Sequence, residues 1–229
     1  MSKFVNHFTV SSRPICYQSV KNMLNNSTGV KVGSLKFSDV MFDSRNCHCI
    51  YVFYEGDNYK LYEENNLPHR GSRCPAEGDN YKLYEENNQN DKESVKYWYI
   101  GSNVSKALVE RLGGHFAPRT KDYANGLLKH IAYTITNMKE RDWIWTDEKT
   151  LGNRVNRANK FVSNAFHIIK DLKLIIICFE ENVDGELKAE IRKIERQLIK
   201  ELKPAFNYMK RNGNRKFVIK NRNGKTIKH

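Results

Sequence analysis

A glutamate in the C-terminal part of the chain occupies a position where a helix normally carries an apolar side chain. The segment 185–203 has apolar residues at helical spacing, and Pro204 ends it. At about 100° per residue, Glu195 falls near the middle of the apolar arc. A carboxylate facing a core is costly unless it is paired or holds a cation. The pattern therefore predicts either a buried salt bridge from Glu195 to an arginine, or a divalent metal site shared with a phosphate.

Two tyrosines and an Arg–His pair could supply further chemistry. Tyr51 and Tyr99 lie in β-branched and aromatic segments that predict neighbouring strands of one sheet. Arg111 and His115 are four residues apart, which places them on one face of a helix that continues through both. Arginine matches phosphate geometry, and histidine or a phenol can move a proton near neutral pH. Taken singly, strand tyrosines usually belong to the core, and such Arg–His pairs usually lie on a solvated face.

The elements that must position these side chains are strands alternating with helices. This order predicts an α/β (α+β) domain, with a small central antiparallel sheet that carries both tyrosines and is flanked by helices. The Gly113-Gly114 pair is expected to end its helix before His115, which makes His130 on the next helix a rival for the histidine role. The predicted strands are 50–54, 97–100, 143–145 and 173–179. The predicted helices are one that is capped by Ser102 or Ser105 and runs to 112, and those at 123–138, 156–170 and 185–203.

Composition narrows the class of partner. The 229 residues include 39 Lys+Arg against 26 Asp+Glu, a net charge of +13, which favours nucleic acid over an anionic membrane surface. The longest apolar run, 174–179, is far shorter than the roughly 20 residues of a membrane span, and the start lacks the apolar core of a secretory signal. Five cysteines indicate reduced thiols. We expect a cytoplasmic protein without a membrane partner.

The charge is unevenly distributed. Residues 209–229 contain eight Lys/Arg and no acid, with a possible short strand at 216–220, whereas residues 55–94 have a net charge of −5. The acidic stretch contains one twelve-residue sequence twice, at 55–66 and 77–88. Two copies are too few for a solenoid, so the repeat indicates a tandem duplication without chemistry of its own. We expect it to lie away from the basic surface.

Together these residues resemble the GIY-YIG nuclease superfamily. Its first motif appears as Cys49-Ile50-Tyr51, and its second as Tyr99-Ile100-Gly101. The Arg-x-x-x-His step matches Arg111 and His115, and Glu195 is followed twelve residues later by Asn207. The chain departs from the family in having Cys49 in place of glycine, and 47 residues between the two tyrosines. Removing one repeat unit would bring that spacing closer to the restriction-enzyme branch.

The resemblance implies a metal-dependent enzyme that hydrolyses phosphodiester bonds in double-stranded DNA. Glu195 would hold one Mg²⁺ or Mn²⁺ ion per active site. Tyr51 would orient or deprotonate the attacking water and relay its proton to His115. Arg111 would stabilise the transition state. The remaining two residues, Tyr99 and Asn207, would support the cluster or orient the phosphate.

The resemblance also sets the expected organisation: an N-terminal extension over 1–45, a nuclease domain over 46–208 and a basic tail over 209–229. No appended DNA-binding module is recognisable, which favours a type II restriction endonuclease, dimeric when it cuts both strands, over a homing or repair-type nuclease. The alternative from another class is a non-catalytic nucleic-acid-binding protein on the same scaffold. Predicted DNA contacts, with a solvated face as the alternative reading, are Arg154, Arg157, Lys160, Lys210 and Arg211.

A zinc site is a further, weaker possibility. Cys47, His48 and Cys49 are adjacent, and His69 and Cys74 follow. Their spacing fits no common structural zinc site.

Overall fold

The structure of the chain is a computed structural model, and it describes nine segments of it. The predicted strand 143–145 lies outside the described residues. The described segments are 5–35, 48–55, 82–85, 96–104, 108–116, 127–136, 165–180, 185–207 and 217–220.

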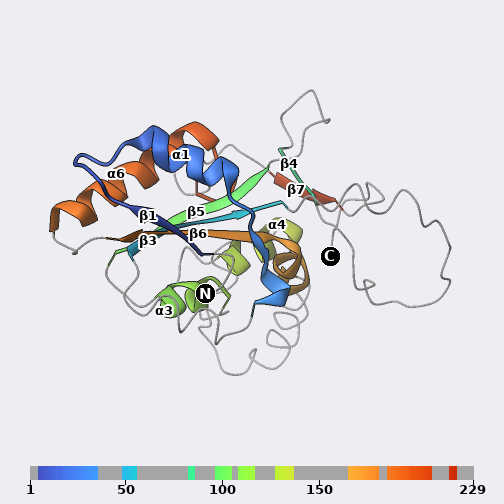
Figure 1. Ribbon diagram of the computed structural model, residues 1–229. Coiled ribbons are helices and arrows are strands. Elements are labelled where there is room, and N and C mark those ends of the chain that lie inside the picture. The colour runs from blue at the N-terminus through green and yellow to red at the C-terminus, as the bar shows by residue number, and fades with distance from the viewer. Residues whose placement is uncertain are drawn as a thin grey trace, which may run out of the picture.

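A five-stranded sheet forms the centre of the fold (Figure 1). Its main path runs in the order β1 (Val5–Thr9), β6 (Lys173–Glu180), β3 (His48–Tyr54) and β5 (Tyr97–Asn103). The two tyrosine strands β3 and β5 are antiparallel neighbours, as predicted. Strand β3 is also antiparallel to β6, and a short strand, β2 (Val30–Lys31), pairs with β6 on the edge that β1 occupies further along.

The α+β class is confirmed, but the expectation of a purely antiparallel sheet is wrong. Strand β1 runs parallel to β6, so the sheet is mixed. Both β1 and β2 come from the predicted N-terminal extension, whose sequence has no clear period-two pattern. The long connection that a parallel pair requires is available because residue 9 and residue 173 are far apart in the chain.

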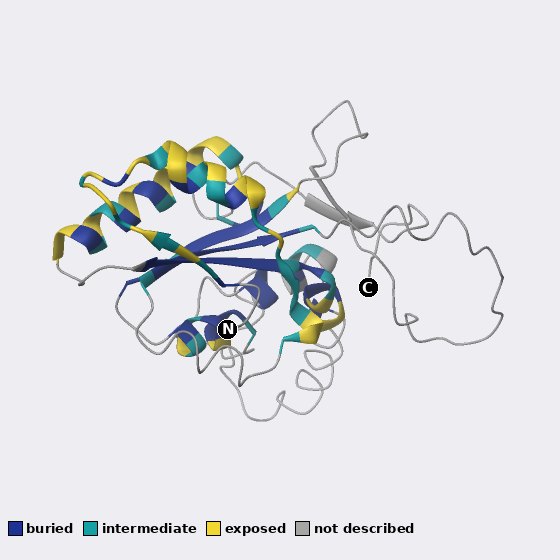
Figure 2. Ribbon diagram, viewed as in Figure 1, coloured by how far each residue is buried: buried dark blue, intermediate teal, exposed yellow. Residues whose placement is uncertain are grey.

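Helices cover both faces of the sheet (Figure 2). On one face, α1 (Tyr17–Asn26) and α6 (Gly185–Leu202) pack with the strand residues of one core cluster, which includes Ile50 and Ile100. On the other face lie α3 (Leu108–Phe116), α4 (Leu127–Thr136) and the helical residues 165–171, in the cluster that contains Tyr51 and Phe53. Alternate residues of β3 thus enter different cores, which explains its uninterrupted burial.

The helix that carries Arg111 and His115 does not end at the glycine pair. Helix α3 continues through Gly113 and Gly114 to Phe116, so the predicted break is wrong. Each glycine in a helix costs only about 1 kcal/mol relative to alanine, and the burial of Leu108, Leu112 and His115 along this helix offsets that cost.

The acidic repeat and the basic tail meet in a separate two-stranded sheet. Strand β4 (Lys82–Glu85), within the second repeat copy, pairs antiparallel with β7 (Phe217–Lys220) in the tail. The short tail strand is confirmed, whereas the expectation that the repeat lies away from the basic surface is wrong for this copy.

Two further expectations concern membranes and thiols. Among the described residues, no helix is long and apolar enough to cross a membrane. Cys16 and Cys49 are free thiols, but Cys178 is disulfide-bonded, so the expectation of reduced thiols is wrong at that residue.

Candidate active site

The hydroxyl of Tyr51 is the centre of a hydrogen-bonded cluster between β3 and α3. Its ring is fully buried in the middle of β3. The hydroxyl oxygen lies 2.8 Å from Nε2 of His115 and accepts a 3.0 Å hydrogen bond from Nε of Arg111. The four-residue spacing on α3 therefore brings both side chains onto one phenol.

His115 is held in one tautomer by the start of the next helix. The backbone N–H of Leu127, the first residue of α4, donates to Nδ1 of His115 at 3.3 Å. With Nδ1 accepting, the neutral imidazole carries its proton on Nε2 and donates it to Tyr51. Burial, followed by the charge of Arg111, lowers the pKa of His115 to about 3, so the ring is neutral at physiological pH. This geometry does not fit the expected proton relay from Tyr51 to His115, because Nε2 already carries a proton.

The rival histidine occupies another place in the core. His130 is buried on α4, where its ring stacks on Phe206 with centroids 5.9 Å apart. The ring of His115, in contrast, contacts Tyr51 and Tyr99. Of the two histidines, His115 therefore occupies the position beside the tyrosines.

Tyr99 completes the aromatic part of the cluster. Its ring lies 4.6 Å from the ring of His115 and stacks at 6.3 Å on that of Tyr51. Burial raises the pKa of both phenols, and the charge of Arg111 opposes this without outweighing it. Both tyrosines are therefore protonated at neutral pH. Because the Tyr51 oxygen accepts from Arg111 and His115, its own O–H proton points to a third partner.

Gly101 provides the space that the Tyr51 hydroxyl occupies. The two residues are directly opposite in the β3–β5 register. A Cβ at Gly101 would lie 2.4 Å from the Tyr51 hydroxyl oxygen, well inside contact distance. The glycine is thus required by a close approach, a reason that only the strand register reveals.

Glu195 is anchored to the edge strand by a serine that the sequence analysis missed. Ser102 donates a 2.6 Å hydrogen bond to Oε2 of the Glu195 carboxylate. Glu195 forms no ion pair with any described residue, so the predicted buried salt bridge is not present there. Burial raises the pKa of Glu195, opposed by the hydrogen bond from Ser102 and by the charges of Arg111 and Arg192. The serine immediately follows Gly101, and its role depends on the packing of α6 against β5.

The environment of Glu195 is suited to one kind of cation site. No cluster of three or more His, Cys, Asp or Glu side chains able to hold a metal occurs among the described residues. Glu195 nevertheless offers a second carboxylate oxygen, Oε1, besides the Oε2 that accepts from the Ser102 hydroxyl. Mg²⁺ commonly binds one or two carboxylates and completes its shell with water and substrate phosphates. A single carboxylate beside Arg111 fits that pattern, and does not fit an all-protein cage.

The weaker zinc hypothesis gains no support. Nε2 of His48 lies 3.1 Å from the carbonyl oxygen of Val104. Cys49 is fully buried, and burial raises the pKa of its thiol to about 12, which disfavours the thiolate that zinc requires. The other predicted ligands, Cys47, His69 and Cys74, lie outside the described residues.

Asn207 binds the outer edge of the second tyrosine strand. Its Oδ1 accepts from the N–H of Ile100 at 2.8 Å, and its Nδ2 donates to the carbonyl of the same residue at 2.6 Å. The preceding residues Ala205 and Phe206 donate to the carbonyls of Tyr97 and Trp98. The segment therefore covers the outer edge of β5, and Asn207 supports the backbone next to Tyr99 and Gly101.

The predicted DNA contacts remain predictions. Arg154, Arg157, Lys160, Lys210 and Arg211 all lie outside the described residues. The structure thus places six of the predicted site residues, Tyr51, Tyr99, Arg111, His115, Glu195 and Asn207, on or against the β3–β5 pair.

Comparison with protein-family models, with curated proteins and with solved structures finds no match for this chain. Inference about its function therefore starts from the residues and their geometry.

Proposed function

We propose that this chain is a metal-dependent endonuclease of GIY-YIG type that hydrolyses phosphodiester bonds in double-stranded DNA, with the organisation of a type II restriction enzyme. The observation that carries the proposal is the hydrogen-bonded Tyr51–Arg111–His115 cluster on the strand pair whose edge anchors Glu195. This set contains a guanidinium for the phosphate, a directed hydroxyl for the nucleophile and a hard oxygen ligand for a cation.

Each side chain has a role consistent with its contacts. Arg111 presents its terminal nitrogens to a phosphate while Nε holds Tyr51, and its fixed charge stabilises the trigonal-bipyramidal transition state. The O–H of Tyr51, held by two donors, orients the attacking water. His115 acts as a neutral donor that positions this phenol. The ring of Tyr99 packs against both, and Asn207 fixes the strand that carries it.

Glu195 would hold the divalent ion, Mg²⁺ or Mn²⁺, through its carboxylate, whose Oε2 accepts from the Ser102 hydroxyl. The bound ion supplies Lewis-acid polarisation of a phosphate oxygen and stabilisation of the leaving oxygen. Ser102 keeps the carboxylate in one orientation. A homodimer would place two such sites on the two strands of a duplex.

Conversion of supercoiled plasmid to nicked and linear forms tests the proposal. The wild-type chain is expected to cut only with Mg²⁺ or Mn²⁺, and Glu195→Gln to lose on the order of 100-fold or more in rate. Glu186→Gln is the matched control, because Glu186 lies on the same helix but pairs with Arg13 at the surface. No metal-dependent cleavage by the wild type, or full cleavage by Glu195→Gln, would sink the assignment.

Failure of cleavage combined with retained DNA binding would instead favour the non-catalytic binding protein. Sequencing the ends of digested genomic DNA then separates the remaining classes. A short fixed motif at every end is expected of a restriction enzyme, and a long, rarely occurring site of a homing nuclease.

A further inference from the structure

The charged side chains of α6 are separated by sign around the helix. At about 100° per residue, the basic residues fall within an arc of about 140° that begins beside Glu195. The acidic residues other than Glu195 fall within about 60° on the opposite flank. We call the first group the basic stripe, which consists of Lys188, Arg192, Lys193, Arg196 and Lys200; the acidic flank consists of Glu186, Glu190 and Glu201.

The N-terminal segment binds the first two acids of that flank. Arg13 forms an ion pair with Glu186 at 3.4 Å. The backbone N–H of Ile15 donates to the carboxylate of Glu190 at 3.0 Å. Both contacts come from the turn that precedes α1.

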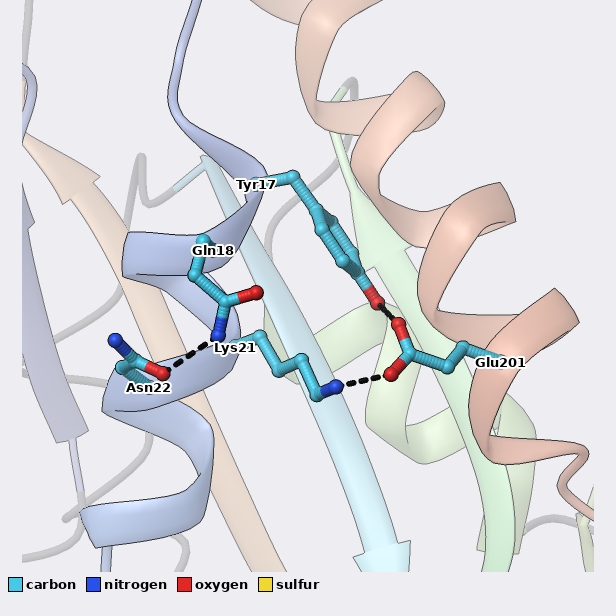
Figure 3. A network of polar contacts seen from close by, with 5 residues as sticks. All are labelled: Tyr17, Gln18, Lys21, Asn22 and Glu201. Carbon is cyan, nitrogen blue, oxygen red and sulfur yellow. Dashed lines mark hydrogen bonds and ion pairs between the residues drawn. The ribbon is translucent and has the colours of Figure 1, made fainter.

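Helix α1 itself binds the third acid (Figure 3). The Glu201 carboxylate accepts a hydrogen bond from the Tyr17 hydroxyl through one oxygen, and an ion pair from Lys21 through the other. These contacts lower the pKa of Glu201, with Lys21 as the leading cause. The acidic flank is therefore the face that α6 turns towards α1, and all three carboxylates have protein partners.

The basic stripe has no such partners among the described residues. Arg192, Lys193, Arg196 and Lys200 are exposed, and none of them forms an ion pair with a described residue. Nε of Arg196 donates to the carbonyl of Arg192 at 3.1 Å, and no described acid pairs with its terminal nitrogens. Arg192 is close enough to Glu195 for its charge to act on that carboxylate. The stripe thus starts at the candidate site and extends away from it.

We propose that the basic stripe of α6 binds the sugar–phosphate backbone of DNA next to the site of cleavage. The direction of the bound strand rests on the proposed function, since Glu195 marks where the scissile phosphate would lie. Lys188, Arg192 and Arg196 recur every four residues, about 6 Å apart along the helix axis, and present one continuous row of cations. Such contacts position the duplex and carry no base specificity.

Two other uses of a basic face fit the structure less well. A helix face that serves only solubility can mix acidic and basic residues. On α6 the acids other than Glu195 lie on the other flank instead, where they have protein partners. A membrane-surface helix needs an exposed apolar face beside its cations, whereas the apolar residues Leu187, Ile191, Ile194 and Leu198 are buried against the sheet.

Equilibrium binding without divalent ions isolates the stripe from catalysis. Fluorescence anisotropy of a labelled 30-base-pair duplex would be measured in EDTA at several salt concentrations. For Arg192→Gln/Arg196→Gln we expect roughly tenfold weaker binding, and a slope of log K against log salt that is smaller by about 2. The charge-matched control is Lys96→Gln/Lys170→Gln, which removes two exposed lysines outside α6 and is expected to keep the wild-type slope.

Equal losses of DNA affinity in the two double variants, or an unchanged salt slope in the α6 variant, would overturn the proposal that the basic stripe binds DNA. So would wild-type binding to anionic phosphatidylserine vesicles without binding to DNA. Circular dichroism checks folding, and Lys188→Gln/Lys200→Gln gives the same test should the arginine variant unfold. If the wild type binds DNA through the basic stripe but never cleaves it, the binding proposal is supported and the nuclease proposal is refuted. If the wild type cleaves DNA but substitutions in the stripe do not weaken binding, the nuclease proposal is supported and the binding proposal is refuted.

Discussion

The imidazole of His115 donates to the hydroxyl of Tyr51 across 2.8 Å, because the N–H of Leu127 occupies its other ring nitrogen. A buried histidine in this setting acts as a fixed donor rather than a base. It orients the phenol and leaves the Tyr51 proton available to a group outside the cluster. Protonating His115 would break the bond from Leu127 and place a second positive charge beside Arg111.

This arrangement predicts a pH-dependent stability with a definite sign. His115 titrates at 6.5 in the unfolded chain and at about 3 in the folded chain. Between these values the unfolded state binds a proton that the folded state does not. The free energy of unfolding should therefore fall as the pH drops below 6.5, by up to about 1.4 kcal/mol per pH unit. Above pH 6.5 the contribution of His115 to this free energy should stay constant. Urea unfolding of wild type and His115→Gln between pH 5 and 7 measures this. The variant should show a shallower dependence, and equal slopes would contradict the assignment.

Ser102 predicts a pH effect on activity. Its hydroxyl stabilises the charged form of Glu195, so Ser102→Ala should raise the pKa of Glu195 further. The ionised carboxylate would then form only at higher pH, and the acid limb of the rate profile should shift upward. We expect a rate loss on the order of tenfold at pH 6 and a smaller loss at pH 8. Ser102→Thr, which keeps a hydroxyl, should behave like wild type; a uniform loss at every pH would argue against this role.

Sequence patterns identify the reactive side chains of the candidate site, but not the residues that form hydrogen bonds with them. Glu195 is visible because it interrupts an apolar period, and Arg111 and His115 because a helix spaces them. Ser102 and Leu127 are invisible to such reasoning, because their contacts depend on how α6 and α4 pack.

The same limit applies to the fold. The β-branched and aromatic run of β3 and the apolar period of α6 predict those elements directly. Strand β1 has no such pattern and owes its place to pairing with β6, in which Asn6 lies opposite Ile177, far along the chain. In α3, likewise, the burial of neighbouring side chains outweighs the low helix propensity of Gly113 and Gly114.

Two glycines provide a matched test of the packing around Tyr51. Gly101→Ala would place a Cβ 2.4 Å from the Tyr51 hydroxyl oxygen, so the tyrosine or the strand must move. We expect a destabilisation of about 1–3 kcal/mol together with loss of cleavage. Gly113→Ala is the control, because a Cβ there meets nothing within 4 Å. On an exposed helical position it should stabilise the protein by about 0.5–1 kcal/mol. Thermal unfolding of the two variants compares them; the same sign of change in both would refute the packing argument.

Deleting one repeat unit tests whether the duplication has a role in the site. Removal of 55–76 joins Tyr54 to Glu77, which has the same following sequence as Glu55. The backbone bond from residue 55 to the carbonyl of Lys96 can therefore re-form, and β4 is kept. No described contact of Tyr51, Arg111, His115 or Glu195 involves the deleted residues.

The shorter loop should change the free energy of unfolding by no more than about 1–2 kcal/mol, in the stabilising direction. Plasmid cleavage should stay within about threefold of wild type, a difference of less than 1 kcal/mol in barrier height. A large loss of cleavage in a variant that still unfolds cooperatively would show that the repeat contributes to catalysis or DNA binding.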